Sequence, residues 1–386
     1  MGATMDSLDA GIETKLHNRL AMLSRDPRNK MLRANCVELA LAQQSYDLVL
    51  HVANEALKDE PQDHQAKFER ASALMGLKRL AEALDDLNAL AKDIDPTPPA
   101  VLQNISLCHY LLGDFSSARS SLSELYIAGN RSADIFRLLI STLHHLGELP
   151  AAITIADCAE EYAKIDPALA GTMALLYLDA NQPQKAARWS SCSLACNPSS
   201  LDSMVVQGTL RAGAFDLHSA RQLFERALSI APTAGRAWLG VALVSMAEHD
   251  LGKAREQAQE AVKYMPTHIG SWHVLGWIQL IQGELEGART TFEHALSLNR
   301  NFAESHGGLG AIAALQGNRS QSERYIEVAE RLDPHCLSAK FARSTLQKGK
   351  GDDQAARETL IGALSGIARE DGSIMSRIID ELNPRK

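Results

Sequence analysis

Prolines recur at a fixed spacing along the second half of the chain. Pro198, Pro232 and Pro266 are each 34 residues apart, and Pro334 lies two such intervals after Pro266. A spacing that persists over several copies is the signature of a repeat protein, in which each unit packs mainly on its neighbours. This period constrains the fold more than any other feature. It predicts a stack of similar units in place of the two or three globular domains that the length of 386 residues would suggest.

The residues between the prolines repeat as well. Segment 269–302 contains Trp272, Leu275, Gly276, Gly283, Ala288, Phe292 and Ala295. Several of these recur 34 residues away, as Trp238, Ala254 and Ala261 on one side and as Leu309, Gly310, Gly317 and Ala329 on the other. In this pattern the chain resembles the tetratricopeptide repeat (TPR) family, and bacterial members in particular. Extended at one phase, the pattern gives ten repeats over most of the 386 residues. They begin near residues 30, 64, 99, 133, 167, 201, 235, 269, 303 and 337.

Each repeat has the composition of two amphipathic helices joined by a short turn, neither of which can bury its apolar stripe alone. Gly276 and Ala288 allow the paired helices to approach closely, and Phe292 fills the space beside them. Gly283 and Gly317 can adopt the left-handed conformation that ends a first helix. Aromatic residues make up only 5% of the chain, which favours helix over strand. The predicted fold class is all-α, and the resemblance implies a right-handed superhelical α-solenoid of helix-turn-helix units.

The repeats divide the chain into three parts. Residues 1–29 form an N-terminal segment, which we expect to be loose over residues 1–12 and to form a capping helix from Glu13 to Ser24. Residues 30–370 contain the ten repeats. Residues 371–386 are predicted to form a C-terminal capping helix, because a solenoid needs a cover with a polar outer face at each end. The apolar residues at helical spacing in that segment are Ile374, Ile378, Ile379 and Leu382.

Composition and charge exclude several classes of function. The 39 Lys and Arg residues against 47 Asp and Glu give a net charge of −8, which opposes general binding to nucleic acid. No apolar run approaches the ~18 residues of a membrane span, and the N-terminus lacks the pattern of a secretion signal. We therefore expect a cytoplasmic protein. The six cysteines show no CxxC spacing, and Cys192 and Cys196 lack the second pair that a zinc site needs.

No motif carries catalytic chemistry once the repeat is taken into account. Residues Gly308 to Ala313 fit a dinucleotide-binding fingerprint, but they fall inside a predicted helix without the strand that the fingerprint requires. His144 and His145 are adjacent, and neighbouring helical residues point about 100° apart, so the two cannot easily share a metal ion. We predict that the chain is not an enzyme and holds no cofactor or metal.

The function is expected on the inner face of the array. The resemblance implies that the fifth, ninth and twelfth residues of each repeat face a concave groove. These positions are apolar in repeats seven and eight, where Trp277 is a candidate binding hot spot, and polar in repeats three and four. The alternative is that neighbouring repeats pack over Trp277. The predicted partner-binding residues are Leu239, Leu243, Met246, His273, Trp277 and Leu280 in the apolar group, with Gln103, Asn104, Tyr110, Arg137 and His144 in the polar group.

These features favour a non-catalytic scaffold, adaptor or chaperone-like receptor that holds a peptide segment or a partner helix in the groove, as bacterial secretion and assembly factors of this family do. One alternative is a regulatory or targeting subunit of an enzyme carried on another chain, such as a glycosyltransferase or a phosphatase. An RNA-binding helical repeat is a third alternative, which the negative charge opposes. We expect a monomer or a weak homodimer.

Overall fold

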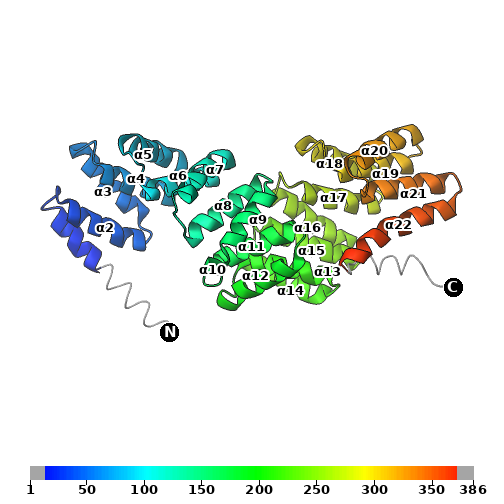
Figure 1. The fold of residues 1–386 in the computed structure, drawn as a ribbon, viewed down its shortest axis with the longest axis horizontal. Helices are drawn as coiled ribbons and strands as arrows, with labels where there is room; N and C mark the ends of the chain where they lie inside the picture. Colours follow the sequence, from blue (N-terminus) through cyan, green and yellow to red (C-terminus); the bar gives the residue numbers. More distant parts are fainter. Residues whose placement is uncertain (1–13, 372–386) are drawn as a thin grey trace. The chain divides into compact units, whose positions relative to one another are not determined.

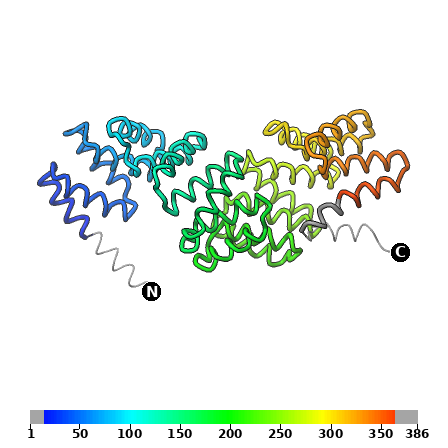
Figure 2. The backbone as a smooth tube through the Cα atoms, viewed as in Figure 1, coloured from blue at the N-terminus to red at the C-terminus, as the bar shows by residue number. Residues whose placement is uncertain are grey.

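The computed structural model describes residues 14–371, and every regular element in that range is an α-helix (Figure 1). The chain divides into two units, residues 1–169 and residues 170–386. Within each unit, helices that follow one another in the sequence lie side by side, as the colour gradient of Figure 2 shows. The prediction of an all-α solenoid of helix-turn-helix units is confirmed.

The helices of the first unit follow a helix over residues 14–23. They are α2 (Lys30–Ala42), α3 (Tyr46–Asp59), α4 (His64–Gly76), α5 (Leu80–Asp93), α6 (Pro99–Leu111), α7 (Phe115–Ile127), α8 (Ala133–His145), α9 (Leu149–Cys158) and α10 (Glu160–Ala163). The second unit begins at Ala170, within α11 (Pro167–Asp179). It continues with α12 (Pro183–Cys196), α13 (Leu201–Gly213), α14 (Leu217–Ile230), α15 (Gly235–Ala247), α16 (Leu251–Tyr264), α17 (Ile269–Ile281), α18 (Leu285–Leu298), α19 (Ala303–Leu315), α20 (Arg319–Leu332), α21 (Leu337–Gly349) and α22 (Asp353–Asp371).

The first helices of the pairs begin at the residues where the 34-residue period places the repeat starts. They begin at Lys30, His64, Pro99, Ala133, Pro167, Leu201, Gly235, Ile269, Ala303 and Leu337. The fourth pair departs from the pattern, because its second helix is interrupted at Ala159 and continues as the single turn α10.

A left-handed residue follows the first helix of every pair, always at the fifteenth position of the repeat. Gly283 (φ +82°) and Gly317 (φ +75°) adopt this conformation, as the sequence predicts. Five repeats hold it without glycine, which costs an L-residue roughly 1–2 kcal/mol. The ten residues are Gln44, Lys78, Gly113, Gly147, Asn181, Phe215, His249, Gly283, Gly317 and Gly351. The turn is thus fixed by the packing of the two helices and not by glycine alone.

Glycines in the first helices make room for buried aromatic rings of the second helices. A Cβ atom on Gly276 would lie 2.7 Å from Cε1 of Phe292, and one on Gly240 would lie 2.4 Å from the same atom of Phe224. Both rings are almost wholly buried, together with the small residue Ala288. The helices therefore pack at a distance that a larger side chain would increase, as predicted for Gly276.

Ion pairs link successive repeats in the second unit. Arg221 on α14 pairs with Glu248, and Arg255, 34 residues later on α16, pairs with Glu284. Each pair joins a second helix to the turn of the next repeat. Because the partners are partly exposed, each pair stabilises the fold by no more than about 1 kcal/mol.

The N-terminal helix covers the first pair. Leu16 is buried against the core of α2 and α3, and Leu20 and Leu23 pack against the same core. The segment predicted to be loose, residues 1–12, and the predicted C-terminal cap beyond Asp371 lie outside the described residues.

Candidate functional site

Helix α15 presents three of the predicted binding residues on one face. Leu239, Leu243 and Met246 are spaced i, i+4, i+7, and the glycine on another face of the helix, Gly240, is pressed against Phe224. Leu243 is 36% exposed, whereas Leu239 and Met246 are half-buried. The helix packs closely through the face that carries Gly240. The apolar stripe on its other face is therefore left partly exposed, at Leu243.

Trp277 lies on the next first helix, α17, and is half-buried. Its indole N–H donates a hydrogen bond to Nε2 of His273, with 3.0 Å between the nitrogens. Its ring lies edge-on to two phenylalanines, Phe292 at 6.2 Å and Phe341 at 5.2 Å between centroids. Phe341 belongs to α21, two repeats further along, so the chain itself covers part of this indole.

His273 is largely buried, and burial is the main cause that lowers its pKa from 6.5 to about 4; the carboxylate of Glu304, 3.9 Å away, offsets only part of this effect. The imidazole is therefore neutral at physiological pH. Since Nε2 accepts the hydrogen bond from Trp277, the ring proton resides on Nδ1. That nitrogen is buried and has no hydrogen-bond partner within residues 14–371.

Glu304 connects this cluster to the beginning of α21. Its carboxylate accepts hydrogen bonds from the backbone N–H groups of Leu337 (2.8 Å) and Ser338 (3.0 Å) and from the Ser338 hydroxyl. The N-cap residue of α21, Cys336, makes no capping hydrogen bond with its side chain. A carboxylate from α19 therefore caps a helix of the next repeat, where the helix dipole favours negative charge.

The first helices of repeats nine and ten touch backbone to backbone at Gly307. A Cβ atom there would lie 2.5 Å from the backbone nitrogen of Ala339. This contact brings α21 close to α19 and places Phe341 against Trp277. Leu280, on the same face as Trp277, is only 6% exposed and belongs to the core of these repeats. The inner face is therefore filled by the chain itself around Leu280 and partly open at Trp277.

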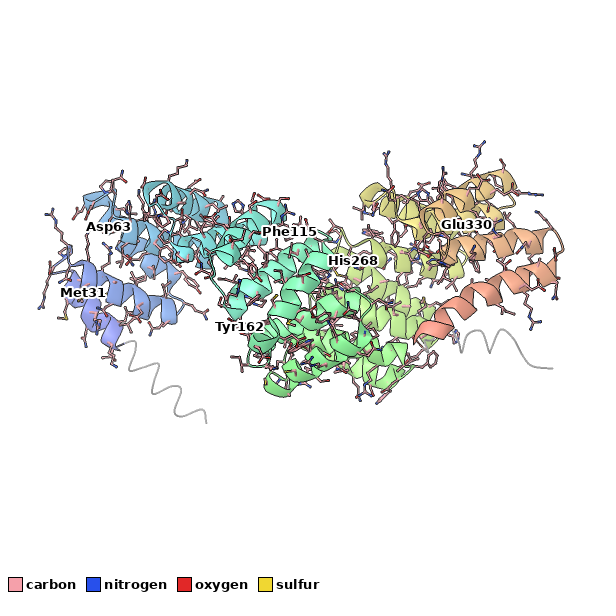
Figure 3. The ribbon with its side chains drawn as sticks, viewed as in Figure 1. Met31, Asp63, Phe115, Tyr162, His268 and Glu330 are labelled. Carbon is pink, nitrogen blue, oxygen red and sulfur yellow. The ribbon has the colours of Figure 1, made fainter. Side chains whose placement is uncertain are left out.

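A second link joins repeats five and seven. The guanidinium of Arg236, at the beginning of α15, donates two hydrogen bonds to the carboxylate of Asp179 at the end of α11, at 2.8 and 3.2 Å. Near it, His268 precedes α17 and accepts a hydrogen bond from the backbone N–H of Ser271 at Nδ1 (Figure 3). The first contact joins the beginning of α15 to the end of α11, and the second caps the beginning of α17.

The polar residues predicted to bind a partner belong to the first unit, whereas the apolar group belongs to the second. Gln103, Asn104 and Tyr110 on α6 and Arg137 and His144 on α8 are all half-buried. Tyr110 packs edge-on against Phe115, with 5.5 Å between ring centroids. Arg137 pairs with Asp134 on its own helix. These side chains are partly accessible, but Tyr110, Arg137 and His144 already have partners within the chain.

Sequence reasoning missed two residues that shape the inner face, Glu304 and Arg236. Both occupy the second position of their repeats, which carries no residue common to all ten. The identity of their partners depends on how tightly successive repeats coil, and the period alone does not reveal this. One sequence signal could have indicated them. It is an acidic or basic residue at the second position of a repeat, next to a repeat whose fifth, ninth and twelfth positions are aromatic or apolar.

The described residues contain no group of three or more His, Cys, Asp or Glu side chains that could hold a metal ion. None of the helices searched over that part of the chain is both long and apolar enough to cross a membrane. Burial raises the pKa of the Cys108 thiol to about 11 and, with the Glu304 carboxylate, that of Cys336 to about 12. These two thiols are therefore poor nucleophiles at neutral pH.

Comparison with protein-family models agrees with this architecture. Two family models described as tetratricopeptide repeat match residues 37–99 and 269–302. A solved structure titled "Crystal structure of MamA" is similar at 19% sequence identity and a TM-score of 0.33, over 42% of this chain and 95% of that chain. No curated protein matches the sequence. The two family matches, together with helix pairs that recur every 34 residues, identify the chain as a tetratricopeptide repeat protein.

Proposed function

We propose that this protein is a non-catalytic scaffold that binds an apolar segment or an amphipathic helix of a partner protein on the inner face of repeats seven and eight. The contact surface consists of Leu239, Leu243 and Met246 on α15 with the uncovered edge of Trp277 on α17. The observation that carries the proposal is the 36% exposure of Leu243 between half-buried apolar neighbours. Apolar anchors set in a partly closed pocket are typical of binding hot spots.

Leu280 is left out of this surface because its side chain is buried in the core. His273 contributes indirectly: its acceptor nitrogen fixes the orientation of the Trp277 indole. Among the polar residues of the first unit, the half-buried Gln103 and Asn104 provide hydrogen-bonding groups for a second, weaker contact. The proposal includes a cytoplasmic location and a monomeric or weakly dimeric state, which sedimentation at several concentrations would test.

A charge substitution tests the surface. Leu243→Asp places a carboxylate in the apolar stripe, and Leu298→Asp on α18 is the matched control, because both leucines are 36% exposed. Affinity purification from the native source should recover the partner with the unaltered protein and with the Leu298 variant, and lose it with the Leu243 variant. Equal recovery with both variants would contradict the proposed surface.

The identity of the recovered partner separates the scaffold from its alternative. A partner that is an enzyme, and whose activity changes on binding, would favour a regulatory or targeting subunit. A partner that is a structural or exported protein would favour the scaffold or chaperone-like role.

A further inference from the structure

Two isoleucines of the first unit lie where the repeat does not require an apolar side chain. Ile127, the last residue of α7, and Ile165, which follows α10, are each 83% exposed, more than any other large apolar side chain of the described residues. They occupy position 29 of the third repeat and position 33 of the fourth. At these two positions the other repeats carry polar residues, alanine or proline. The packing of the array therefore does not explain them.

One buried aromatic ring supports both isoleucines. Phe136 of α8 is wholly buried and contacts the rings of Tyr126 and Tyr162, with 6.0 and 5.0 Å between centroids. Ile127 follows Tyr126 directly. The backbone N–H of Ile165 donates a hydrogen bond to the carbonyl of Tyr162 at 3.2 Å. The two isoleucines are therefore held by one aromatic cluster, on the edge of the first unit where the second helices of repeats three and four end.

Neither isoleucine is covered by the residues that follow its helix. The guanidinium of Arg131, in the loop after α7, lies 3.9 Å from the centre of the Tyr126 ring and donates to the Tyr126 carbonyl at 3.0 Å, so it does not fold over Ile127. In the fourth repeat the second helix is interrupted at Ala159, and Ile165 lies in the loop after the extra turn α10. Exposed apolar side chains gathered on one edge are typical of an interaction surface.

The surface around the isoleucines is acidic. Residues 157–166 contain four acidic residues and one lysine, which pairs with Glu161. Glu124 on α7 adds an exposed carboxylate one turn before Ile127. We call Ile127, Ile165, Glu124 and the acidic residues of 157–166 the isoleucine edge. Its composition favours an occupant that carries apolar side chains and an excess of positive charge.

The same chain has a surface with these properties at its N-terminal end. Residues 14–33 contain six Lys or Arg residues and one Asp, whereas residues 34–169 contain ten Lys or Arg residues and 20 Asp or Glu residues. The leucines of the N-terminal helix pack on the first repeat, which leaves Lys15 and Met22, seven residues apart, on its exposed face. Met22 is 58% exposed, and Met31, at the beginning of α2 (Figure 3), is 79% exposed.

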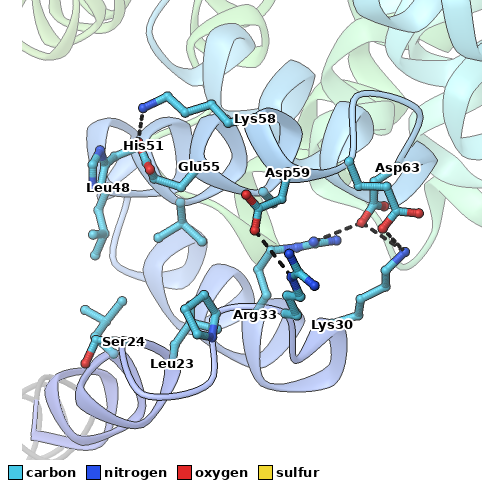
Figure 4. A pocket seen from close by; sticks show the side chains of 16 residues that line it. Leu23, Ser24, Lys30, Arg33, Leu48, His51, Glu55, Lys58, Asp59 and Asp63 are labelled. Atoms are coloured by element: carbon cyan, nitrogen blue, oxygen red, sulfur yellow. Dashed lines mark hydrogen bonds and ion pairs between the residues drawn. The ribbon is translucent and has the colours of Figure 1, made fainter.

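The positive charge at this end that a second molecule can use lies outside the cleft between the N-terminal helix, α2 and α3. In the cleft, basic side chains pair with the carboxylates beside them, as Lys30 and Arg33 do with Asp63 (Figure 4). Lys15 and Arg25, by contrast, are exposed and pair with no carboxylate in the described part of the chain. Their charges are therefore available to another molecule.

We propose that the isoleucine edge of one copy of the chain binds the N-terminal end of a second copy. Met22 and Met31 contact the two isoleucines, and Lys15 and Arg25 face the acidic residues. The N-terminal helix of the same copy cannot make this contact, because it is packed on the first repeat. Since the contact joins two different surfaces, each copy contributes one of each. The contact uses no residue of the surface proposed in repeats seven and eight, so either proposal can fail alone.

Sedimentation velocity of the purified full chain tests the contact. The average mass should rise between about 1 and 200 μM, the range of a weak interface. Ile127→Asp together with Ile165→Asp should weaken this association at least about tenfold, because it removes the apolar anchors of the edge. The matched control, Ile230→Asp together with Ile281→Asp, adds the same charge at exposed isoleucines of the second unit and should retain it. An unaltered chain that stays monomeric, or equal association of the two double variants, would overturn the proposal.

Charge reversal identifies the two surfaces as partners. One variant combines Lys15→Glu with Arg25→Glu at the N-terminal end, and the other combines Glu124→Lys with Glu161→Lys at the isoleucine edge. Each variant alone brings like charges together and should remain monomeric. An equimolar mixture of the two again offers opposite charges at every contact and should associate. A mixture that stays monomeric would refute the pairing of these surfaces.

The control for the second variant is Glu293→Lys together with Glu327→Lys, which makes the same change in net charge at exposed positions of α18 and α20. This control should associate like the unaltered chain, and all variants should keep its circular dichroism. Association of the unaltered chain should also weaken between about 0.05 and 0.5 M salt, because salt screens exposed charges. Association that strengthens with salt would show that charge does not select the partner and would contradict the proposal.

Discussion

The indole N–H of Trp277 donates its hydrogen bond to a histidine nitrogen, Nε2 of His273, one turn away on α17. This bond requires the imidazole to be neutral, because a protonated ring has no acceptor. The position of the indole, and with it the apolar surface of repeat eight, is therefore linked to the protonation state of a buried side chain.

The stability of the protein should depend on pH through His273. Its pKa is lowered from 6.5 to about 4 by burial, so the unfolded chain binds the proton more tightly than the folded chain does. The contribution of the neutral imidazole to the free energy of unfolding is then fully present above about pH 6.5. It is lost as the pH falls towards 4, which lowers the free energy of unfolding by on the order of 3 kcal/mol. Urea unfolding between pH 4 and 7 would measure this slope.

The control for this slope is a pair of glutamine variants. His273→Gln keeps an acceptor for the Trp277 indole but cannot titrate, so the dependence on pH should become shallower. His249→Gln, at an exposed turn, should leave it as it is in the unaltered protein. The same slope in all three proteins would show that His273 does not control the acid sensitivity.

Trp277→Ala should weaken capture of the partner by about 2 kcal/mol or more, since large aromatic anchors dominate the energetics of such interfaces. Because Trp277 also contacts Phe341 and Phe292, the variant should lose some unfolding free energy as well. Titration calorimetry with the purified partner would measure binding, and circular dichroism would verify the helical content. Unchanged affinity would mean that Trp277 has only a structural role.

Gly307→Ala should destabilise the last two repeats by about 1–3 kcal/mol, the usual cost of overpacking. The added Cβ atom would lie 2.5 Å from the backbone nitrogen of Ala339, which cannot move without shifting α21. Gly213→Ala is the matched control: nothing lies within 4 Å of its Cβ position, and alanine favours the helix. Chemical unfolding of the two variants should give changes of opposite sign.

Lys78→Gly should raise the free energy of unfolding by about 1 kcal/mol, because Lys78 is held at φ +61° and glycine removes the strain of that conformation. The reverse substitution, Gly283→Ala at φ +82°, should lower it by a similar amount. Thermal unfolding of both variants would measure these changes. A loss of stability in Lys78→Gly would indicate that the lysine side chain contributes more than its backbone conformation costs.

The 34-residue period predicted the fold because each period corresponds to one pair of helices that packs on the next pair. The first helices begin where the 34-residue spacing places them, and Gly283 and Gly317 adopt the left-handed turn. The five repeats that make this turn without glycine could not be foreseen, since Phe215 or Lys78 adopts it under the constraint of tertiary packing and against its own preference.

The candidate site was predictable only in part. The i, i+4, i+7 spacing placed Leu239, Leu243 and Met246 on one face of α15. The burial of Leu280 and the partial cover of Trp277 depend on the close contact at Gly307, which draws α21 towards the inner face. Such contacts between repeats arise from small differences in how each pair is rotated on the next, and a shared period cannot encode them.

The cap that Glu304 provides for α21 has a consequence for how this end of the molecule opens. His273, Glu304 and the first amides of α21 belong to three successive repeats, so none of the three can detach without exposing a buried polar group. Arrays of this kind ordinarily fray one unit at a time from a free end. Here the last three repeats should exchange their amide hydrogens with a common opening free energy, as a single cooperative block.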